Sequence, residues 1–129
     1  MIDVTKLLVG VPVMDEQHAS LVELYNALEA PGSDLEALWG AFAAYADFHF
    51  EEEESLMRQY AYPGTQAHVA GHQAYRATFE RMLNEPGGGP GAGREAMLAY
   101  VATWLAEHIL GVDKHFAAFL LAAGYAPRR

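Results

Sequence analysis

The segment HVAGHQAYRATFERM, residues 68–82, decides the fold class of this chain. Its large apolar and histidine side chains recur in steps of four and three residues, at His68, His72, Tyr75, Phe79 and Met82. That spacing places them along one face of an α-helix, as in helices that pack nearly antiparallel in a bundle. The segment therefore predicts a helix with two histidines, one turn apart, on the face turned towards the core.

Three other segments repeat this pattern before and after residues 68–82. In each, the residues at this spacing form a stripe along one face of the predicted helix. The three stripes are Met14, His18, Leu21, Tyr25 and Leu28; Leu38, Phe42, Tyr45 and His49; and Met97, Val101, Trp104 and His108. β-branched residues are scarce, and apolar and polar residues do not alternate as they do in half-buried strands. The sequence predicts an all-α fold, namely an up-down-up-down antiparallel four-helix bundle with a short C-terminal helix.

Proline and glycine divide the chain between these segments. They stand at Pro12, Pro31-Gly32, Pro63-Gly64, Gly124 and Pro127, and in the run EPGGGPGAG of residues 85–93. We expect one domain over residues 1–129, with an N-terminal arm at residues 1–12, a flexible loop at residues 85–93 and the short helix at about residues 113–123.

Local signals indicate where two of the helices begin. Ser33 followed by Glu36 is typical of a capping box, which would open the second helix. Pro63 followed by Thr65 suits the start of the third helix.

Composition and charge limit the classes of function. The 129 residues are 52% hydrophobic, contain no cysteine and carry a formal net charge of −9. The hydrophobic content excludes a disordered chain, and the acidic excess argues against nucleic-acid binding. No segment approaches the length of about 20 apolar residues that a membrane span needs. Because residues 1–13 do not resemble a signal peptide, we expect a soluble cytoplasmic protein without membrane insertion.

Five of the six histidines occupy the predicted core stripes. They are His18, His49, His68, His72 and His108. A lone histidine on an apolar face is usually a hydrogen-bonded core residue, and each unpaired buried imidazole costs about 1–3 kcal/mol. Five on four helices therefore predict a common bound group. Without cysteine, a metal here would be held by imidazole and carboxylate.

Two carboxylates accompany these histidines. Glu53 follows His49 by four residues, so both lie on one helix face. Asp113 follows His108 by five residues, which in an unbroken α-helix would turn it about 140° away. For both to face one site, we expect the helix to end or bend at Gly111, with Asp113 capping the final short helix.

The number of these ligands indicates two metal ions. Five imidazoles and two carboxylates are one more than an octahedral ion accepts. If both carboxylates and a solvent-derived oxygen bridge two ions, the histidines divide into three and two, and one ion keeps an open position. An open position at the bottom of an apolar pocket would bind a small neutral molecule.

Four motifs carry this chemistry in order along the chain. They are DEQH at residues 15–18, HFEEEE at residues 49–54, HVAGH at residues 68–72 and HILGVD at residues 108–113. With YAYP at residues 60–63 and WLAEH at residues 104–108, the set resembles the hemerythrins, and in brevity and surrounding sequence the bacterial hemerythrins. The resemblance covers about residues 11–120 and fills all seven ligand positions.

The resemblance implies two iron ions with an oxo or hydroxo bridge, in a non-haem centre that binds O2 reversibly. By motif position, the closed iron would have His68, His72 and His108, the open iron His18 and His49, and the bridges would be Glu53 and Asp113. The implied apolar O2 pocket consists of Leu21, Phe50, Trp104, Leu105 and Ile109. Iron itself is carried over from the resemblance, because nitrogen and oxygen ligands also suit zinc, cobalt, nickel and manganese.

The implied pocket favours binding over turnover, because its residues supply no acid or base. We therefore expect an O2-binding protein for oxygen storage, transport or delivery, not an enzyme, with an oxygen-consuming enzyme as the recipient. The alternatives are a di-iron enzyme acting on peroxide or nitric oxide, an oxygen or redox sensor, and a structural dizinc bundle. A ferritin-like oxidase is disfavoured, because no glutamate lies three residues before any histidine.

Four further polar residues lie within the motifs or next to them. We expect His115 on the surface, and Glu51 and Glu52 on a solvated helix face. Glu54 belongs either to that face or to the partners that orient a ligating histidine.

Overall fold

A computed structural model describes residues 2–30, 32–84 and 94–125. Its elements are the 3-10 turn η1 (Val4–Leu7), the α-helices α1 (Pro12–Glu29), α2 (Leu35–Gln59), α3 (Thr65–Asn84) and α4 (Arg94–Glu107), the π-helix η2 (His108–Asp113) and the α-helix α5 (Lys114–Ala122). This part of the chain contains no β-strand, so the all-α prediction is confirmed. The loop predicted at residues 85–93 lies outside the described residues.

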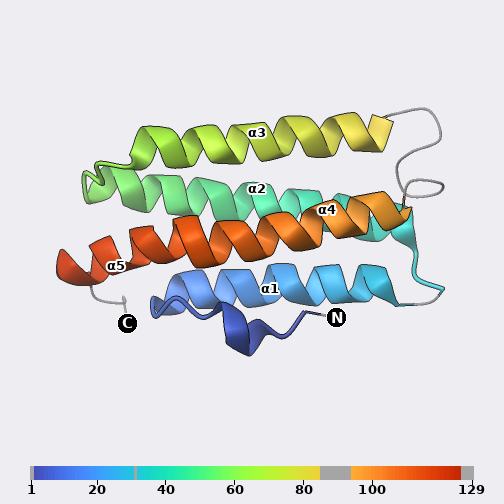
Figure 1. Ribbon diagram of the computed structural model, residues 1–129, viewed down its shortest axis with the longest axis horizontal. Coiled ribbons are helices and arrows are strands. Elements are labelled where there is room, and N and C mark those ends of the chain that lie inside the picture. Colours follow the sequence, from blue (N-terminus) through green and yellow to red (C-terminus); the bar gives the residue numbers. More distant parts are fainter. Residues whose placement is uncertain (1, 31, 85–93, 126–129) are drawn as a thin grey trace.

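The helices form the predicted four-helix bundle (Figure 1). Each of α1, α2, α3 and α4 packs against two others, since α1 contacts α2 and α4, and α3 contacts the same two helices. Successive helices run in opposite directions, which gives the up-down-up-down order. The short helix α5 extends the line of α4 through η2, so the last three elements form one long rod. Within the described residues, none of the helices is long and apolar enough to cross a membrane.

The N-terminal arm packs on the bundle before α1 begins. Leu7, Val9 and Val11 are buried, and the side chain of Asp15 accepts hydrogen bonds from the backbone N–H groups of Val9 and Gly10. Proline at the first position of α1 suits a helix start, where its missing N–H has no helical partner to lose.

The N-cap of the second helix lies one residue later than predicted. Asp34, not Ser33, is the N-cap of α2, and its side chain accepts a hydrogen bond from the N–H of Ala37. The capping box of Ser33 and Glu36 is therefore wrong in register. The third helix begins at Thr65 as predicted, and its hydroxyl donates to the carbonyl of Tyr62.

The buried stripe of α2 also differs from the predicted one. Leu38 and Tyr45 are only partly buried, whereas Trp39 and Ala46, each one residue further along, are buried. Because α2 packs against both α1 and α3, its core face is wider than a single line in steps of four and three. Phe42 and His49 are buried as predicted.

The predicted break at Gly111 is absent. The chain continues from α4 into α5 through η2, whose wide turns have hydrogen bonds from each N–H to the carbonyl five residues earlier. The N–H of Lys114 donates to the carbonyl of Ile109 in this way. Asp113 has helical backbone angles, and its side chain makes no capping hydrogen bond. A π-helix brings residues five apart to the same side, so His108 and Asp113 face one site without a break.

Candidate metal centre

The seven predicted ligands converge in the middle of the bundle. One comes from α1 (His18), two from α2 (His49 and Glu53), two from α3 (His68 and His72) and two from η2 (His108 and Asp113). All are buried, and the most exposed, His108, shows 6% of its surface. The spacing of four on α2 and α3, and the π-turns of η2, place each pair on one helix face.

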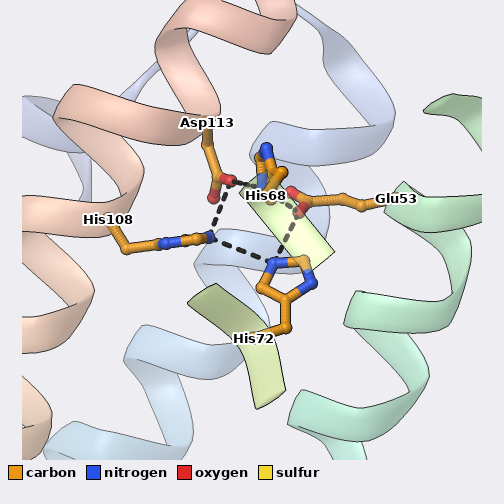
Figure 2. A group of neighbouring side chains, drawn as sticks. All are labelled: Glu53, His68, His72, His108 and Asp113. Atoms are coloured by element: carbon orange, nitrogen blue, oxygen red, sulfur yellow. Dashed lines mark hydrogen bonds and ion pairs between the residues drawn. The ribbon is translucent and has the colours of Figure 1, made fainter. Parts of the chain in front are cut away.

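These side chains form two overlapping groups. The first contains Glu53, His68, His72, His108 and Asp113 and is drawn in Figure 2. The second contains His18, His49, Glu53 and Asp113. Within each group, the ligand atoms lie within 4.8 Å of one another. The two carboxylates are common to both groups, so the histidines divide into three and two.

The imidazoles turn their Nε2 atoms towards the shared carboxylates. Asp113 Oδ1 lies 2.9 Å from Nε2 of His68 and 3.0 Å from Nε2 of His108, and Oδ2 lies 2.9 Å from Nε2 of His18. Glu53 Oε2 lies 3.0 Å from Nε2 of His49.

In the first group, His72 contacts both Glu53 and His108. Its Nε2 lies 3.4 Å from Oε1 of Glu53 and 3.1 Å from Nε2 of His108 (Figure 2). Five nitrogens from four helices thus surround four carboxylate oxygens.

Two of the imidazoles form a hydrogen bond to a polar side chain through Nδ1, the ring nitrogen that points away from the carboxylates. Nδ1 of His49 donates to Oε1 of Gln17 at 2.7 Å, and Nδ1 of His72 donates to Oε2 of Glu54 at 2.9 Å. Such contacts leave Nε2 free to bind and hold the ring in orientation. The sequence had left the role of Glu54 open and had missed Gln17. The only signal for Gln17 was its place directly before His18 in the first motif.

Burial and mutual contact shift the pKa values of the cluster. Burial opposes the charging of His18 and His68, but contact with the negative Asp113 and Glu53 outweighs it and raises each pKa to about 9. For His108, burial is the stronger effect and lowers the pKa. Burial would raise the pKa of both carboxyls, yet the surrounding histidines hold it below the usual range.

The unpaired atoms of this cluster fit a metal. Both oxygens of Glu53 and of Asp113 are buried, and among the described residues none of the four has a hydrogen-bond partner of acceptable geometry. The same is true of Nε2 in His18 and His68. Buried polar atoms without partners are costly unless they bind something, and carboxylate and imidazole are ligands of zinc, iron and manganese. The cluster is suited to binding metal ions.

Comparison with known proteins points the same way. Residues 9–120 match the model of the hemerythrin HHE cation binding domain. The chain belongs to the hemerythrin family. It is 29% identical to a bacteriohemerythrin of Stenotrophomonas maltophilia over 116 residues, which cover 84% of this chain and 74% of that protein.

Two further relatives agree with this family assignment. A bacteriohemerythrin of Ralstonia nicotianae is 25% identical over 116 residues, 89% of this chain and 85% of that protein. A hemerythrin-like protein of Naegleria gruberi is 28% identical over 112 residues, 87% of each chain. The family resemblance seen in the sequence is therefore confirmed.

The hemerythrin resemblance had also implied an apolar pocket, and two of its five residues, Phe50 and Trp104, lie against imidazoles of the cluster. Leu21, Phe50, Leu105 and Ile109 are buried, while Trp104 is partly exposed. Phe50 stacks on His72 with ring centroids 3.9 Å apart, and Trp104 stacks on His108 at 4.3 Å. His115, expected outside the hemerythrin motifs, is exposed and belongs to neither metal-binding group.

Proposed function

We propose that this hemerythrin-family chain binds O2 reversibly at a di-iron centre, for oxygen storage, transport or delivery. The observation that carries the proposal is the overlap of two ligand groups that share Glu53 and Asp113. One group has three histidines and the other has two, so two bridged ions would be held unequally. The ion held by His18 and His49 would keep a coordination position free.

Iron, when bound, would supply the electrons and the open position that O2 requires. The chain holds and orients the ligands, through Gln17 behind His49 and Glu54 behind His72. Phe50 and Trp104, whose rings stack on His72 and His108, would exclude water from these imidazoles, and the buried side chains of Leu21, Leu105 and Ile109 would complete the proposed pocket.

The residues of the proposed pocket are better suited to a binding protein than to an enzyme. The five residues of the proposed pocket, namely Leu21, Phe50, Trp104, Leu105 and Ile109, contain no group that donates or accepts a proton near neutral pH. An oxygen-consuming enzyme would be the recipient of the bound O2. The relatives named bacteriohemerythrin support the same function.

The test is to load the protein with ferrous iron without air, measure the iron content, and then admit O2. We expect two iron ions per chain and a visible absorption band that appears with O2 and disappears when O2 is removed. Irreversible oxidation without a reversible band would overturn the proposal. Rapid catalytic consumption of peroxide or nitric oxide would instead show an enzyme.

A further inference from the structure

An ion pair between Arg76 and Asp47 joins α3 to α2 beside the metal centre. Nε of Arg76 donates to Oδ1 of Asp47 at 2.8 Å, and the two side chains are 33% and 58% exposed. Both residues also line a small cavity of about 60 Å³ between the two helices. Because side chains do not fill this space, the position of Arg76 depends on the ion pair more than on close packing.

The guanidinium group of Arg76 lies over the ring of Phe50. Its central carbon is 5.0 Å from the ring centroid. The same ring stacks on the imidazole of His72, with centroids 3.9 Å and planes 14° apart. One face of a ring cannot hold both groups at these distances, so Phe50 lies between Arg76 and His72. The face of an aromatic ring is negative and attracts a cation.

Helix periodicity produces this arrangement. His72 and Arg76 are four residues apart on α3, and Asp47 and Phe50 are three residues apart on α2, so each pair lies on one helix face. The ring of Phe50 is therefore inserted between two side chains of the neighbouring helix. We call the four side chains, in the order Asp47, Arg76, Phe50 and His72, the Arg76 stack.

His72 has two contacts that orient its ring. The hydrogen bond of 2.9 Å between its Nδ1 and Oε2 of Glu54 fixes the direction of that nitrogen. The nearly parallel ring of Phe50, which is 1% exposed, opposes a tilt of the imidazole plane. Together they direct Nε2 of His72 towards Oε1 of Glu53, 3.4 Å away (Figure 2). A change in either contact should therefore alter how His72 presents Nε2 to a metal.

We propose that Arg76 is a positioning residue for the metal ligand His72. Its guanidinium group, held by Asp47, keeps the ring of Phe50 against the imidazole. Arg76 thus acts on the metal centre through Phe50 and from the surface of the protein. The consequence for iron rests on the proposed di-iron centre, whereas the order of the rings in the stack does not.

Substitution of Arg76 tests the stack in the metal-free protein. Arg76→Met keeps a long unbranched side chain and removes the cation. We expect the ring of Phe50 to flip about two- to fivefold faster, which corresponds to the loss of a partly exposed cation–π contact. NMR line-shape analysis of the ring signals measures this rate. The ring of Phe116, which lies 5.9 Å from that of His68, is the internal control and should flip at an unchanged rate.

The iron-loaded protein tests the effect on the ligand. Arg76→Met should lose iron to a chelator about two- to fivefold faster than the parent protein, and its iron absorption spectrum should shift, because His72 is less well oriented. Arg58→Met is the matched control, since Arg58 is an exposed arginine in the last turn of α2. Arg76→Lys should recover part of the loss, because the ammonium group keeps a positive charge near the ring.

Substitution of Asp47 tests the order of the contacts. If Asp47 acts by holding Arg76, Asp47→Asn should have a smaller effect in the same direction. It should add nothing further when it is combined with Arg76→Met, because the group that it holds is then absent. Circular dichroism shows whether each variant is folded. If Arg76→Met is not folded, Arg76→Lys and Asp47→Asn test the stack in its place.

Three results would overturn the inference. They are unchanged Phe50 flipping or unchanged iron loss in folded Arg76→Met, equal changes in Arg58→Met, and full additivity of the two substitutions in the stack. Faster Phe50 flipping and iron loss in Arg76→Met, in a protein that does not bind O2 reversibly, would keep the inference and remove the proposed function. Reversible O2 binding with Phe50 unaffected by Arg76→Met would do the reverse.

Discussion

At the scale of single residues, the centre is a set of buried charges without any buried lysine or arginine among the described core residues. Glu53 and Asp113 are 1% and 0% exposed, and isolated carboxylates so deeply buried are strongly unfavourable. Three imidazoles lie within 3.0 Å of Asp113 and share its charge. The same imidazoles can release their protons to a metal ion, which would then balance both carboxylates.

Removing one of the two histidines of the smaller group should affect only part of the centre. His49→Ala leaves His18 as the sole imidazole of that group, so we expect the iron content to fall from two ions per chain towards one. His115→Ala serves as the control, because His115 is exposed and belongs to neither group. Iron content and colour measure both variants. Equal behaviour of the two would mean that the assigned ligands are wrong.

Glu54 offers a test of the contacts behind the ligands. Glu54→Ala removes the acceptor of the His72 Nδ1 proton, and we expect metal affinity to fall about 10–100-fold while the helical content is kept. Glu52→Ala, two residues earlier on the exposed face of α2, should leave the affinity unchanged. Glu54→Gln should recover part of the loss, because its amide oxygen can accept the same proton. Affinities can be measured by competition with a chelator, and equal losses in the Ala variants would contradict the orienting role.

That the candidate ligands come together could be predicted from the sequence, and the contacts that Gln17 and Glu54 make with them could not. His49 with Glu53, and His68 with His72, stand four residues apart, and a helix brings such pairs together whatever surrounds them. Gln17 reaches His49 from another helix, so its contact depends on how α1 packs on α2. Only the tertiary structure contains that information.

At the scale of elements, the π-helix η2 determines the angle between the side chains of His108 and Asp113 around the helix axis. His108 and Asp113 are five residues apart, and either a break or a wider turn brings them together. Gly111 made a break the more natural prediction, and the structure shows the wider turn. The same six residues continue the rod, so Phe116, Ala117 and Leu120 of α5 are buried on the bundle.

Substitution of Gly111 tests this account. A Cβ atom at Gly111 meets nothing within 4 Å, and the residue lies inside a continuous helix. Gly111→Ala should therefore stabilise the protein by about 0.5–1 kcal/mol, because glycine loses more backbone freedom on folding than alanine does. Urea denaturation measures the change, with iron content as the control for an intact centre. Marked destabilisation would indicate that the position needs glycine.

The stripe of α2 shows where periodicity is insufficient. Steps of four and three through His49 fit both Leu38 with Tyr45 and, one residue later, Trp39 with Ala46, and only the second pair is buried. A helix in contact with two neighbours has a broad core face, and its exact centre follows from the packing of those neighbours. The helices and their order could be predicted; this rotation could not.

At the scale of the whole molecule, the metal-free protein should lose stability as the pH rises from about 6.5 to about 9. The pKa of His18 and of His68 is raised to about 9 in the fold, so their stabilising charge is fully present below the unfolded value of 6.5 and is lost as the pH approaches 9. His108, whose pKa is lowered, titrates below this window. The lowered carboxyl pKa values matter only in acid.

Urea denaturation at pH 6.5 and pH 9 measures this dependence. The metal-loaded protein is the control, and its midpoint should change less, because a bound ion has replaced the protons of these imidazoles. A metal-free protein that is more stable at pH 9 than at pH 6.5 would contradict the assigned direction.

The carboxylates common to both ligand groups also govern how the centre fills. An ion in one group would fix the oxygens of Glu53 and Asp113 in the positions that the second ion requires. The second ion would then bind to a site already arranged by the first, and filling would be cooperative. With one equivalent of iron, a native mass spectrum should show mainly empty chains and chains with two ions, and few with one. The two ions would thus bind as a pair.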